Sequence, residues 1–324
     1  MQFQMLRSIG VSIINYKTAE LTIACVQSVL ADVGNLPVQI VVVDNASGDG
    51  SAERIADWIA EQPAGTPVRL VCSKANTGFS GGHNLGMAAL DADWYLILNS
   101  DAVLRPGFLQ AMQDATAANP RTGLIAPQIE TEDGDIQVSC FRFHSPWSEL
   151  IRGAGSGPVT RILKRHVVAL QPPVDPEQIE WASFACILLN ARMAKQIGPM
   201  DEGYFLYFED AEYSLRARRA GWTIMQETQA VMVHYRGGSG PVKALEQARK
   251  RLPPYFYASR TRFFRQAYGI AGPWLANLMW SAGRLMAQVR QMLGKPAPRR
   301  IEAEPRDIWT NVLHPLGPRR APGE

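Results

Sequence analysis

The sequence predicts an α/β fold with a mostly parallel central sheet, followed by a basic helical extension. Three observations lead to this prediction. Short apolar runs alternate with amphipathic segments through the first 126 residues, polar residues follow several of the apolar runs, and the charge balance changes after Arg249. Alternating strands and helices are typical of a parallel sheet covered on both faces. Ligands of such sheets bind beyond the carboxyl ends of the strands.

The first part of the chain supplies most strands of this sheet. Apolar runs predict strands at 11–14, 39–43, 68–71, 94–98 and 123–126, and amphipathic segments predict helices at 19–30, 51–61, 82–90 and 106–117. Asn15, Asp44 and the run Asn99–Asp101 directly follow three of the strands. Three polar clusters at three strand ends are difficult to attribute to turns alone, so we expect a binding site at this edge.

Two further segments complete the expected domain, residues 1–240. Residues 127–180 are irregular and hold many Pro and Gly, and we expect them to form an insertion over the site. The following block predicts a strand at 181–189, helices at 191–197 and 209–221, and strands at 223–226 and 231–234.

The remaining residues, 241–324, predict a basic helical extension with a loosely ordered tail. Residues 249–300 contain eleven Lys or Arg and no acid, whereas the whole chain has a net charge of +3, so the rest carries −8. This asymmetry indicates an anionic partner. Apolar residues recur at helical spacing through 274–293. That helix either packs on the domain or lies in a membrane interface, and the cations and tryptophans favour the interface.

Composition excludes several other classes of protein. No apolar run reaches the roughly 18–20 residues that a membrane-spanning helix needs. The four cysteines lie far apart without metal-ligand spacing, which indicates free thiols in a reducing cytoplasm. The first strand is followed by Asn-Tyr-Lys-Thr and not by G-x-G-x-x-G, which argues against a nicotinamide or flavin dehydrogenase. We expect no nucleic-acid partner.

Several acidic residues and one histidine stand where they could do chemistry. Asp44 could accept the N3–H of a uracil or thymine, although a turn also explains an Asp at a strand end. Glu209 and Asp210 begin a helix that ends in arginines, which the helix dipole alone would explain. The dipole does not explain the aromatic residues at 204–208, which suit a pocket wall. His234 ends a strand and becomes a candidate metal ligand together with Asp101.

These motifs, taken together and in this order, resemble family 2 glycosyltransferases, particularly their bacterial rhamnosyltransferase-like branch. The resemblance covers about residues 8–240. It rests on Val11-Ser-Ile-Ile-Asn-Tyr, Val42-Val-Asp-Asn-Ala-Ser, Asn76-Thr-Gly-Phe-Ser-Gly-Gly-His-Asn-Leu-Gly, Leu98-Asn-Ser-Asp and Phe208-Glu-Asp-Ala-Glu-Tyr-Ser-Leu-Arg. It implies the GT-A fold, an inverting mechanism, a nucleotide-diphosphate sugar donor and Mg²⁺ or Mn²⁺.

The resemblance also assigns roles to individual residues. Asp210 matches the general base, and Glu209 flanks it. Asp101 matches the key residue of the family's DxD metal motif. His234 matches a histidine that is among the metal ligands in relatives. The donor site is expected at Asn15, Tyr16, Asp44, Asn76, Asn84 and Asn99. The chain departs from the family at Asn99, which replaces a carboxylate, and at Phe184, which stands where relatives usually carry Gly.

The function that follows is a metal-dependent hexosyltransferase of polysaccharide biosynthesis. The best specific hypothesis is transfer of L-rhamnose from dTDP-rhamnose to a hydroxyl of a polyprenyl-linked or cell-surface glycan. A transferase that uses a UDP-hexose or UDP-N-acetylhexosamine is the alternative. A catalytically inactive nucleotide-sugar-binding protein is the alternative from another class. We expect a cytoplasmic protein that binds peripherally to the anionic inner face of the cell membrane.

Overall fold

The computed structural model describes residues 7–235, 242–296 and 301–322. In these residues one nine-stranded mixed sheet has the order β3-β2-β1-β4-β10-β6-β11-β5, with β7 paired to β6. The strands β3, β2, β1 and β4 are parallel, β6 and β11 are parallel to each other, and β10 and β5 run antiparallel to their neighbours. The bounds are β1 Ile9–Asn15, β2 Val38–Asp44, β3 Val68–Cys72, β4 Trp94–Asn99, β5 Ala102–Leu104, β6 Thr122–Glu130, β7 Ile136–Gln137, β10 Cys186–Asn190 and β11 Thr223–His234.

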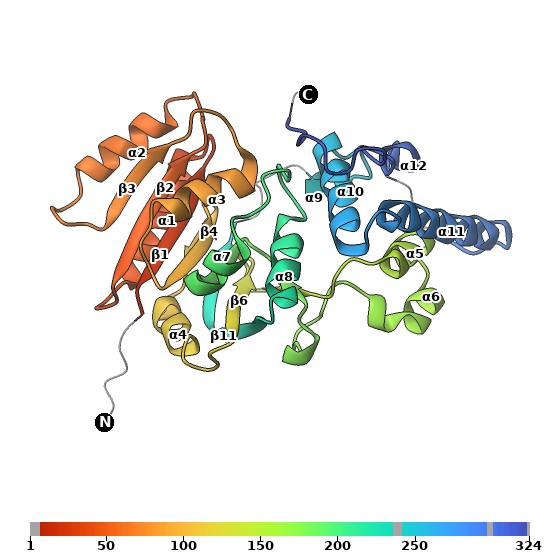
Figure 1. Ribbon diagram of the computed structural model, residues 1–324, viewed down its shortest axis with the longest axis horizontal. Coiled ribbons are helices and arrows are strands. Elements are labelled where there is room, and N and C mark those ends of the chain that lie inside the picture. Colours follow the sequence, from red (N-terminus) through yellow and green to blue (C-terminus); the bar gives the residue numbers. More distant parts are fainter. Residues whose placement is uncertain (1–6, 236–241, 297–300, 323–324) are drawn as a thin grey trace.

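Helices cover both faces of this sheet (Figure 1). They are α1 Ala19–Asp32, α2 Ser51–Ala60, α3 Gly78–Ala88, α4 Phe108–Ala115, α7 Ala191–Ile197 and α8 Glu209–Arg219. Leu96 and Leu98 of β4 belong to one buried cluster, and Ile97 between them belongs to another. Successive side chains of a strand point to opposite faces, so a strand buried on both faces reads as a continuous apolar run. The predicted α/β architecture is confirmed.

Some strand boundaries differ from the expectation. The strand expected at 181–189 is divided into β10 and the two-residue β9 (Trp181–Ala182), which pairs with β8 (Cys140–Phe141) in a separate small sheet. The two strands expected after Thr223 are one strand, β11, with an irregularity between Glu227 and Val231. The three-residue β5 was not predicted, because so short a segment carries no readable periodicity.

The insertion at 127–180 and the C-terminal extension pack against each other (right half of Figure 1). The insertion contributes α5 (Pro146–Ala154) and α6 (Gly157–Ile162). The extension contributes α9 (Val242–Gln247), α10 (Pro254–Tyr268), α11 (Gly272–Met292) and α12 (Glu304–Asp307). A Cβ atom at Gly283 of α11 would lie 2.3 Å from the carbonyl oxygen of Leu150, so only glycine allows α5 so close. The insertion was expected over the polar edge of the sheet, but α5 instead supports the C-terminal helices.

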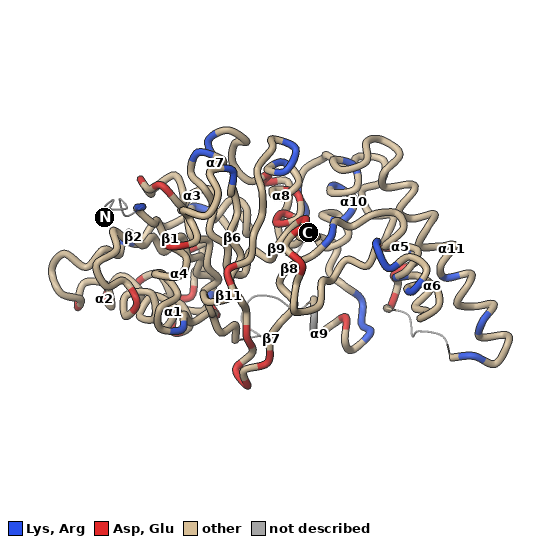
Figure 2. Tube along the Cα trace, turned by 90° about the horizontal axis from the view of Figure 1, so that it is seen from below, with Lys and Arg blue, Asp and Glu red and all other residues tan. Residues whose placement is uncertain are grey.

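Several cations of the basic extension are paired inside the protein, contrary to the expectation that they are unopposed. Arg260 is 2% exposed, and its Nη2 donates to Glu149 of α5 at 3.0 Å. Arg262 pairs with Asp201, and Arg251 with Asp307. Accordingly, Lys and Arg are spread over the helical half and do not gather in one patch (Figure 2). The acidic body and the basic extension therefore neutralise each other in part.

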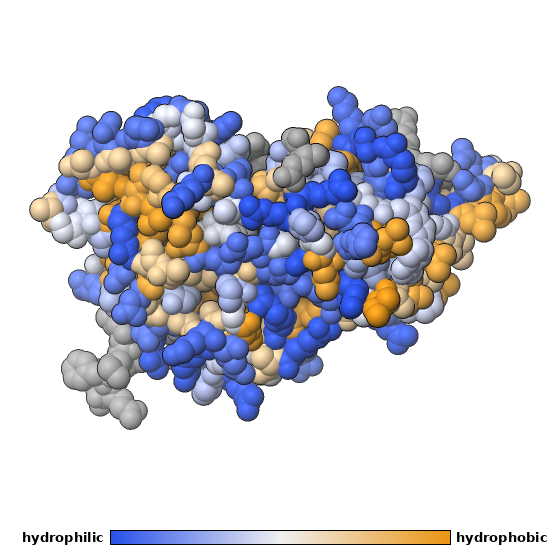
Figure 3. Space-filling model, turned by 45° about the horizontal axis from the view of Figure 1, so that its top comes forward, coloured by the Kyte–Doolittle hydropathy of each residue, from blue (hydrophilic) through white to orange (hydrophobic). Residues whose placement is uncertain are grey.

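Helix α11 turns its apolar stripe outward. Leu278, Leu285 and Met292 are 58%, 61% and 85% exposed, whereas Gly283 and Ala287 of the opposite side are buried. Apolar surface is visible where α11 forms the right-hand end of the molecule (Figure 3). No helix in the described part of the chain is long and apolar enough to cross a membrane. The helix thus packs inward with Trp280 and its small residues, and the large apolar residues of its outer stripe stay exposed.

The expectation of a loosely ordered tail is wrong for residues 301–322. Ile308 is completely buried and Ile301 is 5% exposed. The carbonyl oxygen of Ile308 accepts a hydrogen bond from the buried Asn277 of α11 at 3.0 Å. These contacts hold the segment against the C-terminal helices.

Candidate active site

A pocket of about 430 Å³ lies at the carboxyl edge of the parallel strands. The structure brings six of the predicted site residues to its wall, namely Tyr16, Asn76, Asn99, Glu209, Asp210 and His234. They come from the ends of β1, β4 and β11, from the loop before α3, and from the start of α8. Parallel strands that end at one edge bring together residues far apart in sequence, which is why these six residues meet at one pocket.

Asn15 and Asp44 lie directly behind this wall. Both are buried, and Asp44 Oδ1 accepts hydrogen bonds from Asn15 Nδ2 at 2.7 Å and from the Ser47 hydroxyl at 2.6 Å. Asp44 Oδ2 accepts the Ser47 backbone N–H at 3.1 Å. Tyr16, by contrast, is 43% exposed at the pocket. The Asn15–Asp44–Ser47 network fixes the ends of β1 and β2 under the exposed tyrosine ring.

Asn45 also holds the pocket wall, although it was not among the predicted site residues. Its Nδ2 donates to Asn76 Oδ1 at 3.1 Å and to the Gly78 carbonyl at 3.0 Å. Its Oδ1 accepts the Thr77 backbone N–H at 3.0 Å. The amide of Asn45 therefore fixes the loop before α3. The sequence signal for Asn45 was its place beside Asp44, directly after the apolar run of β2.

Asp101 and His234 meet because β5, which begins directly after Asp101, pairs with β11, which ends at His234. Ala102 pairs with His234 in the antiparallel register of β5 and β11. His234 Nε2 lies 3.1 Å from Asp101 Oδ1, and the Tyr235 N–H donates to the Asp101 carbonyl at 2.8 Å. Asp101 is 1% exposed, and its Oδ2 has no hydrogen-bond partner among the residues that the structure describes. A buried carboxylate oxygen without a partner is costly, and a bound cation would satisfy it.

Glu209, which is buried, and Asp210, which is half-buried, form an acidic pair at the first turn of α8. Burial raises the pKa of Asp210 to about 7, opposed by hydrogen bonds from backbone N–H groups, including that of Phe184. Burial, and then the neighbouring Asp210, raise the pKa of Glu209 well above its usual value. Glu209 Oε2 has no hydrogen-bond partner. Two adjacent carboxyl groups resist simultaneous ionisation, so the pair holds a proton near neutral pH.

The backbone immediately before this pair is in an unusual conformation. Tyr207 and Phe208 have φ angles of 72° and 68°, in the left-handed region that aromatic residues rarely adopt. Tyr207 lines the pocket beside Phe205 and Tyr255. Of the aromatic residues expected to form the wall, Phe205 and Tyr207 line the pocket, whereas Tyr204 and Phe208 are buried in a core cluster. The two successive left-handed residues turn the chain into α8.

Phe184 and His83 also line the pocket, and their contacts show what each does there. The ring of Phe184 is 1% exposed and meets Tyr213 edge to face, so it fills the core rather than the cavity. His83 was not predicted as a site residue. Its Nδ1 lies 2.9 Å from the Ser12 hydroxyl, and burial lowers its pKa to about 3, so its ring is neutral. Its position in the Asn76–Gly86 motif was the available signal.

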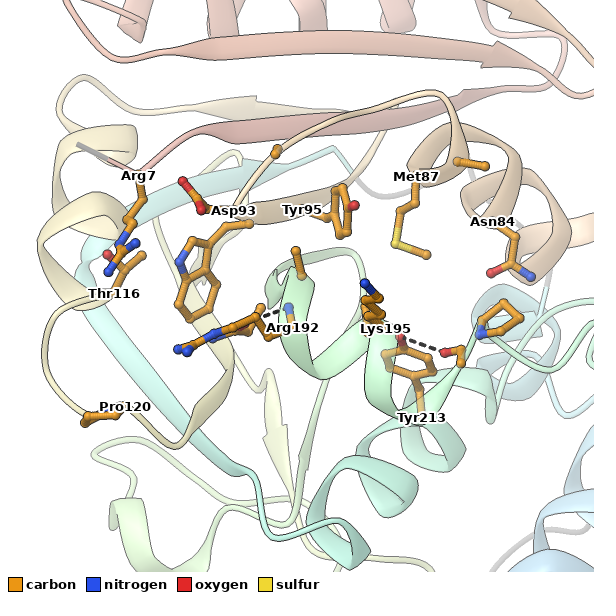
Figure 4. A pocket seen from close by; sticks show the side chains of 18 of the residues that line it. Arg7, Asn84, Met87, Asp93, Tyr95, Thr116, Pro120, Arg192, Lys195 and Tyr213 are labelled. Carbon is orange, nitrogen blue, oxygen red and sulfur yellow. Dashed lines mark hydrogen bonds between the residues drawn. The ribbon is translucent and has the colours of Figure 1, made fainter. Parts of the chain in front are cut away.

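Asn84 does not reach this pocket. Its Nδ2 donates to the Met200 carbonyl at 2.9 Å, and its Oδ1 accepts the Met200 N–H at 2.9 Å. It lines a second cavity of about 620 Å³ at the opposite edge of the sheet, shown in Figure 4. The acid of that cavity, Asp93, accepts hydrogen bonds from Ser8. The larger cavity therefore lacks the paired carboxyl groups of the smaller one.

Comparisons with known proteins agree with this geometry. Residues 8–145 match the model of glycosyl transferase family 2. The chain is 28% identical over 281 residues to an N-acetylglucosaminyl-diphospho-decaprenol L-rhamnosyltransferase of Mycobacterium tuberculosis, covering 82% of this chain and 86% of the relative. It is 26% identical over 235 residues to a low-salt glycan biosynthesis hexosyltransferase of Haloferax volcanii, covering 69% of this chain and 66% of the relative.

Two solved structures have the same fold. One is a mannosyltransferase from Pyrobaculum calidifontis in complex with GDP-Man and Mn²⁺, with a TM-score of 0.57, 14% identity, and coverage of 90% of this chain and 77% of the other. The second is GalNAc-T7 with UDP, GalNAc and Mn²⁺, with a TM-score of 0.60, 13% identity, and coverage of 81% and 48%. Residues 8–145 are thus similar to family 2 glycosyl transferases, and the chain has the GT-A fold of these solved glycosyltransferases.

Proposed function

We propose that this protein is an inverting glycosyltransferase that moves L-rhamnose from dTDP-rhamnose to a hydroxyl of a lipid-linked glycan. The observation that carries the proposal is the acidic pair Glu209 and Asp210 in the same pocket as Asn99 and His234. The named activity of the mycobacterial relative supports the choice of sugar and of acceptor class.

In this mechanism Asp210 is the general base. The acceptor oxygen forms a bond to the anomeric carbon as the bond to the diphosphate oxygen breaks on the opposite face. The acceptor proton passes to a carboxylate oxygen of Asp210. A base with a pKa of about 7 combines a useful ionised fraction with real basicity at neutral pH. Glu209 flanks the base, and burial together with the neighbouring Asp210 raises the pKa of Glu209 well above its usual value, which favours its protonated form beside the base.

Asp101 and His234 would hold Mg²⁺ or Mn²⁺, and the partnerless Asp101 Oδ2 fits this role. When bound, such a cation neutralises charge on the leaving diphosphate. In the described part of the chain no group of three His, Cys, Asp or Glu is placed to hold a metal. Two protein ligands suffice where the donor's phosphates supply others, as is usual for Mg²⁺.

The nucleoside is assigned to the end of β1. The exposed ring of Tyr16 offers a stacking surface, and Asp44, which Asn15 holds behind the pocket wall, would accept a pyrimidine N3–H. Asn76 and Asn99 supply amides along the same wall. Asn84 is withdrawn from this set, because its amide is engaged with Met200.

We further assign residues 1–240 to the transferase domain and 241–324 to an extension that binds an anionic membrane surface peripherally. The outward apolar stripe of α11 supports this assignment. The boundary between the two parts, residues 236–241, lies outside the described residues. A lipid-linked acceptor would then be met at the surface where it resides.

The deciding experiment is turnover with dTDP-rhamnose, a UDP-hexose and UDP-N-acetylglucosamine, each with Mn²⁺ or with EDTA. We expect turnover of dTDP-rhamnose that EDTA abolishes, and its loss in Asp101→Ala. Turnover of a UDP-sugar alone would replace the assigned donor. Nucleotide binding without turnover of any donor would mean an inactive binding protein. Activity undiminished by EDTA would refute the metal.

A further inference from the structure

The end of the chain returns to the pocket. After α12 the chain runs from the helical half back to the middle of the molecule (Figure 1). We call residues 309–322 the C-terminal strap. Pro322 of the strap lines the same pocket as Asp210 and His234. Pro322 therefore forms part of a wall to which the sheet edge, the helices on the sheet and Tyr255 of α10 also contribute.

Two arginines fasten the strap. Arg262 of α10, which also pairs with Asp201, donates from Nη1 to the Gly317 carbonyl at 3.2 Å. Arg319 of the strap donates from Nη1 to the Thr77 carbonyl at 3.1 Å, and its Nη2 lies 3.5 Å from the Asn76 carbonyl. The first contact ties the strap to the helical half, and the second ties it to the loop before α3.

The loop that Arg319 contacts is itself part of the pocket. Asn76 and Gly78 line the cavity. Asn45 holds this loop from the end of β2, through Asn76 Oδ1 and the Thr77 N–H. Arg319 holds its carbonyl groups from the other side. The planar fork of a guanidinium can engage two neighbouring acceptors at once, which a lysine ammonium cannot do with the same geometry.

We propose that the C-terminal strap is a wall of the donor pocket, and that Arg319 is the positioning residue that fastens it to the Asn76–Thr77 loop. The identity of the ligand as a nucleotide-sugar rests on the proposed function, but the fastening does not. Donor binding then depends on residues from both ends of the chain. Loss of the contact frees both the strap and the loop, and the donor must order them when it binds.

Arg319→Ala and Arg320→Ala provide a matched pair. Arg320 is the next residue, is exposed, and donates to Asn311 within the strap itself. We expect Arg319→Ala to raise the KM for the donor about tenfold, the scale of one charged hydrogen bond, with kcat within about twofold. The KM of Arg319→Lys for the donor should lie between those of the wild type and Arg319→Ala. The KM of Arg320→Ala should equal that of the wild type. Equal KM values for the two alanine variants, or a lower KM in Arg319→Ala, would overturn the proposal; the lower KM would identify the strap as an inhibitory cover.

Hydrogen–deuterium exchange of the full chain without donor tests the fastening separately. Arg319→Ala should speed exchange in peptides covering 74–80 and 309–322, and Arg320→Ala should leave the 74–80 peptides unchanged. If the wild type turns over no nucleotide sugar but these exchange differences appear, the proposed function is wrong, whereas the proposed role of Arg319 in holding the strap to the Asn76–Thr77 loop is supported. If exchange in Arg319→Ala equals that of the wild type, the strap proposal fails, whatever the enzyme's activity.

Discussion

Glu149, which is buried, and Asp210, which is half-buried, are both carboxyl groups on the first turn of a helix, but their surroundings differ. Burial opposes ionisation of Glu149, yet Arg152 and Arg260 outweigh it and lower its pKa to about 2. Burial raises the pKa of Asp210 to about 7, opposed only by backbone N–H groups. Glu149 joins α5 to α10, whereas Asp210 faces the pocket beside Glu209.

The difference separates a structural carboxyl group, Glu149, from the proposed general base, Asp210. A buried carboxylate that two arginines satisfy stabilises the packing of the insertion on the extension, and it stays ionised at any physiological pH. A buried carboxyl group without a cation keeps a pKa near neutrality and can exchange a proton with a substrate. The distribution of arginines, more than burial, assigns the two roles.

Asp210→Asn should have the largest effect on activity. The amide preserves the size of the side chain but cannot accept the acceptor proton, so turnover should fall by about 100-fold or more. Initial rates at saturating donor measure this effect. Glu212→Gln is the control, because Glu212 on the same helix pairs with Arg216. If Asp210→Asn retains more than about a tenth of the activity, Glu209 becomes the candidate base.

Glu149→Gln should cause the largest loss of stability. It leaves the buried Arg260 without its charged partner, which typically costs about 3–5 kcal/mol and is measurable by urea unfolding. Because the folded pKa of Glu149 is depressed, its contribution is present above its unfolded pKa and is lost as pH falls toward about 2. Glu20→Gln, in an exposed pair with Arg54, should change little. Comparable stability of the two variants would contradict the structural role of Glu149.

The pH dependence of activity sharpens the same contrast. The base must be ionised, so kcat/KM should rise with pH through about 7 rather than near 4. The raised pKa also means that the folded protein holds a proton that the unfolded chain releases, so Asp210 weakens folding as pH rises through this range. Asp210→Asn should therefore melt higher than the wild type at pH 8. A rising limb centred near pH 4 would show that Asp210 is not the titrating base.

Membrane binding should show the smallest effect. The protein should pellet with anionic liposomes, and Leu278→Glu with Leu285→Glu on the exposed face of α11 should reduce the bound fraction about tenfold. Ile136→Glu, at an exposed apolar residue of β7, is the control. Because Arg260 and Arg262 are already paired, added salt should release the protein only in part. A protein that stays in the supernatant even at low salt does not use α11 in this way.

The sequence alone was sufficient for most of the sheet and for the position of the pocket. Continuous apolar runs of β1, β2 and β4, each followed by polar residues, specify parallel strands whose ends meet. The aromatic run before Glu209 indicated the pocket wall. The prediction placed Asn84 in the donor pocket because it belongs to the same motif as Asn76, which does line the pocket. Asn84 instead bonds to Met200, and no pattern in the sequence of the motif distinguishes the two positions.

Only the tertiary structure decided which charges are neutralised and where the end of the chain lies. Arg260 and Glu149 are 111 residues apart, and Arg319 and Thr77 are 242 apart. A sequence records the periodicity of neighbours along the chain, so it determined the strands, the helices and the polar strand ends. Residues that become partners only when the chain folds lie far apart in the sequence, so their pairing produces no periodic pattern in it. The paired cations of the extension and the strap over the pocket were therefore decided by the packing of distant segments.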